Sequence, residues 1–311
     1  MAQRPPVSVV IPSYNGAEKL PRLISALGKT SYRDFHVIVV DNGSTDGTAH
    51  VAETCLRENA LQGRVLIREK DHIASSARNE GFRASTGELV VFADDDVRPV
   101  WPEWLDVLVE FMSGHDDAGM AGPAVVSPDG ETLQFGGLQG FLHGYYRDPL
   151  GGKRYADIPK APVRVNSLIG PMLIGRRKVL TEIGPWDEKL DPQMFEETDF
   201  MWRISTYGAS IYWVPAARVI HDGGASFQRR VPDAILQRSM RHSFRSVLKN
   251  APVSTVPIEL AWVFMATAAA HPWRALGMLP GVIRWNLQLL PDTFMHREAM
   301  KQLKGRFSRN A

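Results

Sequence analysis

Three consecutive carboxylates, Asp94, Asp95 and Asp96, are the strongest candidates for chemistry in this sequence. They directly follow the apolar run Leu89–Ala93, whose composition is typical of a buried strand. Because adjacent carboxylates repel one another, a hard divalent cation such as Mg²⁺ or Mn²⁺ is their natural partner. On an extended chain, Asp94 and Asp96 point to the same side and can face one ligand. An acidic loop before a helix near Trp101 is the structural alternative.

A second acidic group lies in the first turn of a helix predicted over Glu196–Tyr207. The peptide dipoles at a helix N-terminus stabilise the anions of Glu196, Glu197 and Asp199, so that one of them can serve as a general base. The alternative is that they only complement the helix dipole. His221 follows a further predicted strand, and its neutral imidazole can ligate Mn²⁺, although a lone histidine is more often structural.

Two more residues have types suited to binding a nucleotide. Asp41 follows the predicted strand over residues 36–40, where its carboxylate can accept a hydrogen bond from a base or a ribose hydroxyl. A turn is the alternative. Arg78 lies on a predicted helix, and its guanidinium can bind a phosphate through two parallel hydrogen bonds. A solvated helical arginine is the corresponding alternative.

The surrounding pattern predicts elements that bring these residues together. Apolar runs at residues 7–11, 36–40, 64–68 and 89–93 alternate with amphipathic helices at 17–27, 45–58 and 73–84. This alternation predicts an α/β fold in which helices cover both faces of a mostly parallel sheet. Ligands of such sheets bind beyond the carboxyl ends of the strands, which is where the polar motifs fall.

The second half of the chain is less regular. Residues 127–165 are rich in Gly, Pro and aromatics, and we expect a long irregular excursion there. We expect strands at 167–174 and 211–214 and helices at 176–183 and Glu196–Tyr207. Beyond Pro232 the pattern is helical, and five prolines divide it into about four helices. These are Pro252, Pro257, Pro272, Pro280 and Pro291.

Composition excludes several classes of protein. The chain has 311 residues, of which 44% are hydrophobic and 23% charged, so it is neither disordered nor repetitive. Its single cysteine, Cys55, rules out an internal disulfide, and the chain lacks dinucleotide-binding, Walker A and zincin motifs. Residues 1–227 carry 23 basic and 30 acidic residues, a net charge of −7, whereas residues 228–311 carry 13 and 4, a net charge of +9. No signal peptide or membrane-spanning segment is predicted.

Taken together and in this order, the motifs resemble those of the inverting family-2 glycosyltransferases with the GT-A fold, including rhamnosyl- and galactofuranosyltransferases. The resemblance covers roughly residues 6–227 and rests on VVIPSYNG at 9–16, VVDNGSTDGT at 39–48, ARNEG at 77–81, FADDD at 92–96, the block at 197–203 and His221. It implies a Rossmann-like catalytic domain over residues 1–228, with a nucleotide-binding half at about 1–125 and an acceptor-side half at 126–228. Residues 229–311 would form a helical C-terminal extension.

The resemblance also implies roles for individual residues. Asp96 and His221 would hold Mn²⁺ or Mg²⁺, and the acceptor would meet Trp186, Asp187 and Glu196. The family pattern Glu-Asp-x-Asp is replaced here by Glu196-Glu197-Thr198-Asp199, so Glu197 is the candidate base and Asp199 its alternative. The donor would be bound by Pro12, Tyr14, Asn15, Asp41, Arg78, Asp94 and Asp95.

The implied activity is metal-dependent, inverting transfer from a UDP- or dTDP-sugar to a hydroxyl acceptor, a glycan or lipid-linked glycan. The alternatives are a nucleotidyltransferase that makes sugar nucleotides and a non-catalytic scaffold that binds them. We expect a cytoplasmic protein with no nucleic-acid partner. The tail would contact the inner face of the cell membrane or form a homodimer, through an aromatic and basic set comprising Trp262, Phe264, Trp273, Arg274, Arg284 and Trp285.

Overall fold

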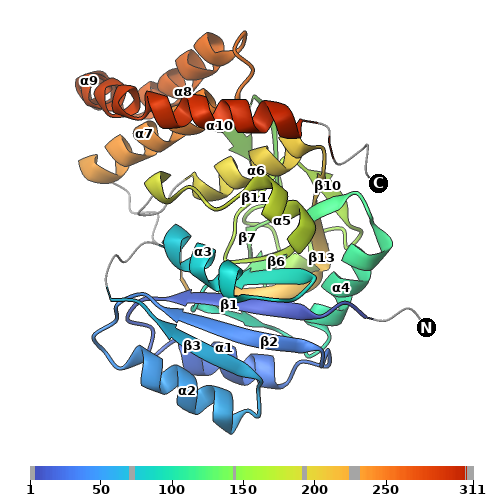
Figure 1. Ribbon diagram of the computed structural model, residues 1–311. Coiled ribbons are helices and arrows are strands. Elements are labelled where there is room, and N and C mark those ends of the chain that lie inside the picture. Colours follow the sequence, from blue (N-terminus) through green and yellow to red (C-terminus); the bar gives the residue numbers. More distant parts are fainter. Residues whose placement is uncertain are drawn as a thin grey trace.

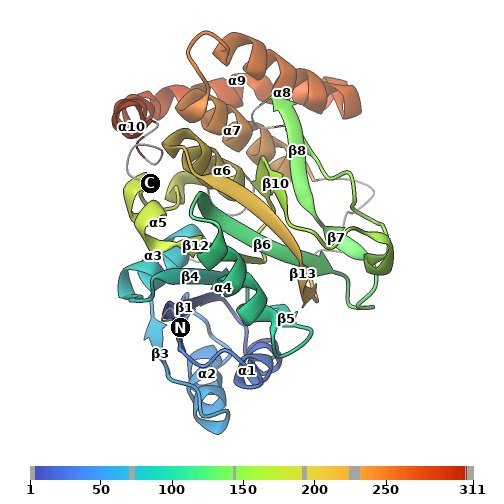
Figure 2. The ribbon, with the colours of Figure 1, turned by 90° about the vertical axis from the view of Figure 1, so that its right-hand side faces the viewer.

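The computed structural model describes residues 4–69, 74–142, 145–190, 195–223, 232–304 and 306. A large twisted sheet runs through the molecule, and a group of four helices is stacked on one end of it (Figure 1; Figure 2). This arrangement agrees with the expected α/β class and helical extension.

The first part of the chain forms the parallel region of the sheet. Strand β1 (Val7–Ser13) pairs in parallel with both β2 (Phe35–Asp41) and β4 (Leu89–Ala93), and β2 pairs in parallel with β3 (Gly63–Ile67). The helices between these strands are α1 (Leu20–Gly28), α2 (Thr48–Glu58) and α3 (Ala74–Ala84). The predicted alternation is confirmed, and position 73 of the third predicted helix lies outside the described residues. β1 is buried on both faces, which is why Ser8 is its only polar residue between Val7 and Ile11.

The sheet continues through strands from the second half of the chain. Strand β12 (Met172–Arg176) pairs antiparallel with β4 and with β6 (Ala118–Val126), and β6 pairs in parallel with β13 (Ser210–His221). The end of β13 also pairs with the short strand β5 (Val97–Pro99), which follows the acidic triplet. In that register His221 lies opposite Val97, so two distant segments of the sequence meet at one edge of the sheet.

The region expected to be irregular contains several short strands. β7 (Leu133–Phe135) and β10 (Val163–Val165) pair with β6 and β13 of the main sheet, while β8 (Gly137–Leu142) forms a second sheet with β9 (Tyr145–Arg147) and β11 (Ser167–Leu168). The expectation of an excursion without regular structure is therefore corrected. Strands of two to six residues are too short to leave a clear periodicity in the sequence.

Three helices support the second half of the sheet. They are α4 (Trp104–Gly114), α5 (Arg177–Ile183) and α6 (Glu196–Tyr207). α6 buries Phe200, Met201 and Ile204 in the apolar core of this half. It ends at Gly208, whose φ of 104° is easily adopted only by glycine.

The four remaining helices are α7 (Asp233–Asn250), α8 (Val256–Ala270), α9 (Pro272–Gln288) and α10 (Leu290–Leu303). Of these, α7 and α10 pack on α6, and α8 and α9 pack on α7. Pro280 lies inside α9 and does not end it, in contrast to the expectation from the prolines. An apolar cluster formed by α7, α8 and α9 includes Trp202 of α6. Within the described part of the chain, none of the helices is long and apolar enough to cross a bilayer.

Candidate active site

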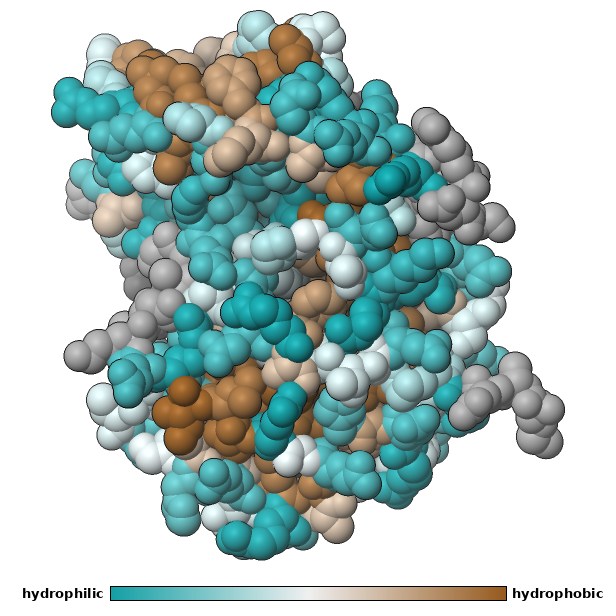
Figure 3. All heavy atoms as spheres, viewed as in Figure 1, coloured by the Kyte–Doolittle hydropathy of each residue, from teal (hydrophilic) through white to brown (hydrophobic). Residues whose placement is uncertain are grey.

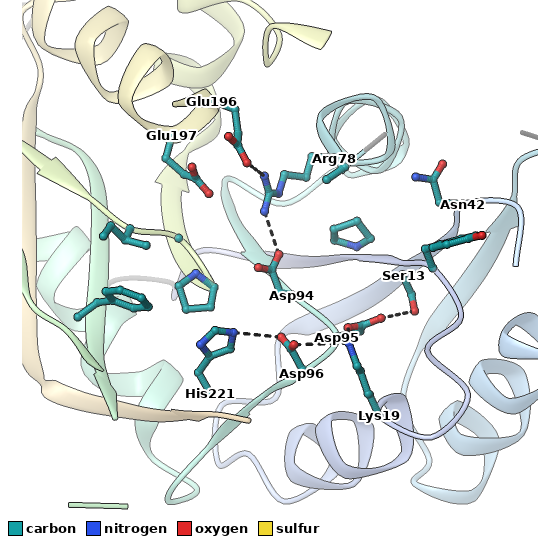
Figure 4. A pocket seen from close by; sticks show the side chains of 17 residues that line it. Ser13, Lys19, Asn42, Arg78, Asp94, Asp95, Asp96, Glu196, Glu197 and His221 are labelled. Carbon is teal, nitrogen blue, oxygen red and sulfur yellow. Dashed lines mark hydrogen bonds and ion pairs between the residues drawn. The ribbon is translucent and has the colours of Figure 1, made fainter. Parts of the chain in front are cut away.

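A pocket of about 520 Å³ opens at the carboxyl ends of β1 and β4 (Figure 4). Loops after parallel strands meet at such an edge, so residues from distant motifs surround one volume. Nine of the residues proposed from sequence line it: Pro12, Tyr14, Arg78, Asp94, Asp95, Asp96, Glu196, Glu197 and His221.

Asp95 is directed toward the loop after β1 rather than toward the centre of the pocket. Its Oδ2 accepts a hydrogen bond of 2.6 Å from the Ser13 hydroxyl, and its Oδ1 lies 3.4 Å from Lys19 Nζ. Burial raises the pKa of Asp95, and the Ser13 hydrogen bond and Lys19 oppose that rise. Sequence reasoning missed Ser13 and Lys19, because a lysine beside a predicted helix resembles an ordinary surface cation.

The side chains of Asp96 and His221 lie next to each other in the pocket. Their Oδ1 and Nε2 atoms are 3.4 Å apart, and the His221 Nδ1 lies 2.9 Å from the side-chain oxygen of Gln134. Lys19 Nζ lies 3.5 Å from the other carboxylate oxygen of Asp96. Burial alone would raise the pKa of Asp96, but His221 and Lys19 outweigh it and the pKa is lowered. This carboxylate is therefore held as an anion.

Gly223 lies close to both Asp96 and His221. A Cβ on Gly223 would lie 2.6 Å from an Asp96 oxygen and 3.2 Å from the His221 Nε2 atom. The backbone amide of Asp222 also donates to the Asp96 carbonyl at 2.9 Å. A side chain at position 223 would therefore displace the Asp96 carboxylate.

Arg78 reaches the pocket from α3 and is buried there. Its Nη2 donates to Asp94 Oδ1 at 2.9 Å, and its Nη1 lies 3.8 Å from Glu196 Oε1. Burial disfavours the charged guanidinium, but the surrounding carboxylates outweigh it and raise the pKa of Arg78. Its Nη1 is buried without a hydrogen-bond partner, which is costly unless a ligand accepts that bond. Arg78 thus has a donor available for an anionic ligand.

Glu197 lies across the pocket from the acidic triplet, near a break in the predicted strand over residues 167–174. The structure divides that strand into β11 and β12, and residues 169–171 between them line the pocket. The Pro171 carbonyl accepts a hydrogen bond from the Asp94 amide at 2.8 Å. A Cβ on Gly170 would lie 3.2 Å from the Glu197 Cγ, so this glycine leaves space for Glu197.

Asp199 and Asp187 do not line the pocket. The Lys249 ammonium of α7 lies 2.8 Å from Asp199 Oδ1 and 2.6 Å from Asp187 Oδ2. Arg203 also binds Asp199, and Arg245 binds Asp187. These cations outweigh the effect of burial and lower the pKa of both carboxyl groups. Asp199 was expected as an alternative base and Asp187 at the acceptor. In the structure both side chains instead form ion pairs, and those with Lys249 connect α6 and the loop at Asp187 with the tail.

Trp186 is part of the core and does not present an open ring face. Its ring stacks on Phe200 at a centroid distance of 4.0 Å, and the Arg78 guanidinium lies 5.0 Å from its centroid. Asn79 bonds both the amide and the carbonyl of Trp186. The expectation that Trp186 stacks on an acceptor sugar is therefore corrected, because both ring faces are covered.

Asn15 and Asp41 do not line the pocket, and their side chains bind backbone amides of the turn after β2. The Asn15 side chain accepts from the Thr45 amide at 3.0 Å, and Asp41 accepts from the Ser44 amide at 3.1 Å. Both therefore shape the turn after β2, as in the alternative given for Asp41. The lining residue at this position is Asn42, which sequence reasoning did not select.

The donor set at Asp96 and His221 fits a divalent ion. Neighbouring ligands of an octahedral ion at ~2.1 Å are about 3 Å apart, close to the 3.4 Å observed here. Among the described residues no group of three acidic, histidine or cysteine side chains is arranged around one ion. Mg²⁺ commonly takes only one or two protein carboxylates and completes its shell with phosphate oxygens and water.

A mixed sheet of this order, with an acidic cluster, a buried arginine and a second acidic helix around one pocket, defines a glycosyltransferase of the GT-A fold. The chain belongs to glycosyl transferase family 2, whose model matches residues 8–184.

Relatives and solved structures agree with this assignment. The N-acetylglucosaminyl-diphospho-decaprenol L-rhamnosyltransferase of Mycobacterium tuberculosis is 28% identical over 96% of this chain and 95% of its own length. The pre-mycofactocin glycosyltransferase of the same organism is 30% identical over 84% of this chain and 52% of its own length. The mannosyltransferase PcManGT from Pyrobaculum calidifontis, solved with GDP-Man and Mn²⁺, superposes with a TM-score of 0.61 at 17% identity, covering 97% of this chain and 86% of that one. The chain spans only a quarter of the y4gI protein of Sinorhizobium fredii, to which it is 27% identical.

Proposed function

We propose that this glycosyltransferase is divalent-metal-dependent and inverting, and that it transfers a sugar from a UDP- or dTDP-sugar to the hydroxyl of a glycan or lipid-linked glycan. The proposal rests on one observation: a single pocket contains groups suited to binding a metal ion, to binding a phosphate and to accepting a proton. Asp96 and His221 are spaced for an ion, the Arg78 Nη1 has no hydrogen-bond partner, and Glu197 lies on the opposite wall.

The donor diphosphate would lie between Arg78 and the acidic triplet. The orphaned Nη1 would donate to a phosphate oxygen, while the Asp94 carboxylate keeps the guanidinium in place through Nη2. Asp96 and His221 would hold Mn²⁺ or Mg²⁺, which supplies positive charge to the departing diphosphate. Asn42, Tyr14 and Pro12 would border the nucleoside, with Asn15 and Asp41 holding the turn behind it.

Glu197 would act as the general base. It lines the pocket, whereas Asp199 is engaged by Lys249 and Arg203 in the interior. Glu197 would remove the proton of the acceptor hydroxyl. The acceptor oxygen would then attack the anomeric carbon on the face opposite the leaving diphosphate, as the bond between that carbon and the diphosphate breaks. The configuration at that carbon would therefore be inverted.

The acceptor proposal rests on the most extensively matching relative described above. Its name gives a diphosphate-linked lipid carrying N-acetylglucosamine as acceptor and rhamnose as the transferred sugar. By that analogy, a glycan on a lipid carrier is the first acceptor to test.

The test is metal-dependent stabilisation by nucleotides. UDP, dTDP and GDP are each added to the purified chain with Mn²⁺, with Mg²⁺ or with excess chelator, and the melting temperature is measured. Ligand at ~100 times its Kd stabilises a protein by about 2.7 kcal/mol, so a bound diphosphate is readily detected. We expect stabilisation by a uridine or deoxythymidine nucleotide only with the metal, and its loss in Asp96→Asn. The matched control Asp157→Asn changes an exposed aspartate outside the pocket and should respond like the wild type.

The outcomes separate the competing functions. Nucleotide stabilisation that is unchanged in chelator contradicts the metal site. Saturable donor binding without transfer to any hydroxyl acceptor favours the scaffold, and formation of a nucleotide sugar from a nucleoside triphosphate favours the nucleotidyltransferase.

A further inference from the structure

Helices α8 and α9 expose an unusually apolar outer surface. Figure 3 shows apolar side chains gathered over these helices at the end of the molecule farthest from α2. Trp273 is 84% exposed, and six further large side chains on the two helices are between 45% and 63% exposed. These are Ile258, Trp262, Met265, Leu276, Ile283 and Leu287. We call this surface the α8–α9 face.

The α8–α9 face differs from the outer side of an ordinary surface helix, which carries polar and charged residues. The two helices together contain a single carboxylate, Glu259, which is 2% exposed and bonded to Thr255. Their cations are Arg284, which is exposed, and Arg274, which pairs with Asp233 of α7. Apart from Gln288, the water-facing positions are apolar or cationic, and neither helix exposes a carboxylate, which indicates a partner that is apolar and anionic.

A cationic groove shares helix α9 with this face. It has a volume of about 500 Å³, lies between α7 and α9, and is lined by Arg238, Arg241 and Trp285. The Arg241 Nε is buried without a hydrogen-bond partner. The groove's one carboxylate, Glu188, accepts a hydrogen bond from Asn79 at 2.8 Å. The groove therefore suits an anionic group beside an apolar surface.

We infer that the α8–α9 face binds the surface of a membrane that contains anionic phospholipids. Tryptophan rings suit the boundary between acyl chains and headgroups, because they combine a large apolar surface with one N–H donor. Arg284 and the groove cations would meet the lipid phosphates. Attachment is interfacial, because no described helix is long and apolar enough to cross a bilayer. The inference does not depend on the proposed transfer reaction.

A second copy of the chain is a poorer occupant of this face. In a two-fold dimer the same patch meets itself, so Arg284 and the groove cations of each copy would approach those of the other. The outer positions of α8 and α9 supply no carboxylate to neutralise them. An anionic bilayer satisfies both the apolar and the cationic parts of the surface.

The inference also explains why the tail is fixed so firmly to the rest of the molecule. Lys249 and Arg245 of α7 form buried ion pairs with Asp187 and Asp199 beside α6. A face held in this way would keep the pocket at a constant position relative to the membrane surface, where a lipid-linked acceptor would be presented.

Flotation with defined vesicles tests the inference. The full chain is mixed with vesicles of phosphatidylcholine alone or of phosphatidylcholine with phosphatidylglycerol, at low and high salt. We expect flotation with the anionic vesicles that weakens at high salt, and a decrease in apparent affinity of about tenfold or more in Trp262→Ser/Trp273→Ser. Arg284→Gln should lose part of the affinity and part of its salt dependence.

The matched control is Ile67→Ser, which changes a residue that is 67% exposed on β3, far from the tail. It should float like the wild type. Each variant's metal-dependent stabilisation by nucleotide is measured in parallel and should be unchanged, so that a failure of membrane binding is distinguished from a failure of the proposed function. Absence of flotation with anionic vesicles, or a dimer that the tryptophan substitutions dissociate, would overturn the inference.

Discussion

The carboxylates of the pocket differ in which cation lies beside them. Arg78 bonds Asp94 and approaches Glu196, while Lys19 lies between Asp95 and Asp96. Among the described residues, Glu197 forms no ion pair, although it lies in the field of Arg78. At the scale of single residues, this difference is the reason for proposing Glu197 as the base.

The substitution Glu197→Gln tests that assignment. It keeps the size of the side chain and removes its ability to accept a proton, so we expect kcat to fall by about 10²- to 10⁴-fold. Donor binding should change little, because the phosphate-binding groups remain. The measurement is steady-state transfer with the donor identified by the nucleotide screen, together with donor titration.

Glu182→Gln serves as the control for this variant. Glu182 lies on α5, is exposed and pairs with Arg306 away from the pocket. Its variant should turn over like the wild type. If Glu197→Gln also retains full turnover, another group accepts the proton.

The connection between α6 and α7 is the main feature at the scale of elements. Lys249 is 4% exposed and bridges Asp187 and Asp199, while Asn250 donates to Asp199 at 2.8 Å. Residues of α6, of α7 and of the loop at Asp187 therefore meet at one ammonium group. This arrangement predicts that the tail stabilises the helix that carries Glu197.

Removing that ammonium in Lys249→Met should destabilise the protein by about 3 kcal/mol, because two buried carboxylates each lose one of their two cationic partners. We also expect kcat to decrease more than donor affinity, since α6 moves relative to the donor. Denaturant unfolding and the kcat-to-KM comparison measure the two effects. The variant Lys301→Met, which removes an exposed ion pair with Glu298, should change stability by less than ~1 kcal/mol. Equal stability of the two variants would contradict the bridging role.

At the scale of the whole molecule, His296 makes the stability of the folded protein depend on pH. It lies 3.2 Å from Asn250 Oδ1, and burial followed by the positive charge of Lys249 lowers its pKa to about 3. Between that value and the unfolded pKa of about 6.5, the unfolded chain binds a proton that the folded chain does not. Stability therefore falls as the pH decreases through this range.

The variant His296→Gln removes this contribution. We expect its free energy of unfolding to decrease less steeply than that of the wild type between about pH 7 and about pH 5. Chemical denaturation at a series of pH values measures both slopes. The carboxyl groups of Asp187 and Asp199, whose pKa values are lowered, add their own loss of stability only below about pH 4, so the two ranges are separable. Identical slopes would show that His296 is protonated in the folded protein.

Local chemistry in the sequence determined the alternation of strands and helices over the first 125 residues and the position of the acidic triplet at a strand end. Buried parallel strands must be apolar and polar residues must begin where they end, so both leave a local signal. Arg78 and His221 could be selected for their chemistry, and the family resemblance paired His221 with Asp96, but no local pattern indicated that Arg78 contacts Asp94 and Glu196.

Only the tertiary structure decided which carboxylates remain available. The pairing of β5 with β13 brings His221 to Asp96, and the packing of α7 on α6 commits Asp187 and Asp199 to Lys249. Trp186 is likewise assigned to the core by Phe200 and Arg78. The physical reason is that an ion pair or a stacked ring depends on distances between segments far apart in the chain, and residue spacing along the sequence carries no record of those distances.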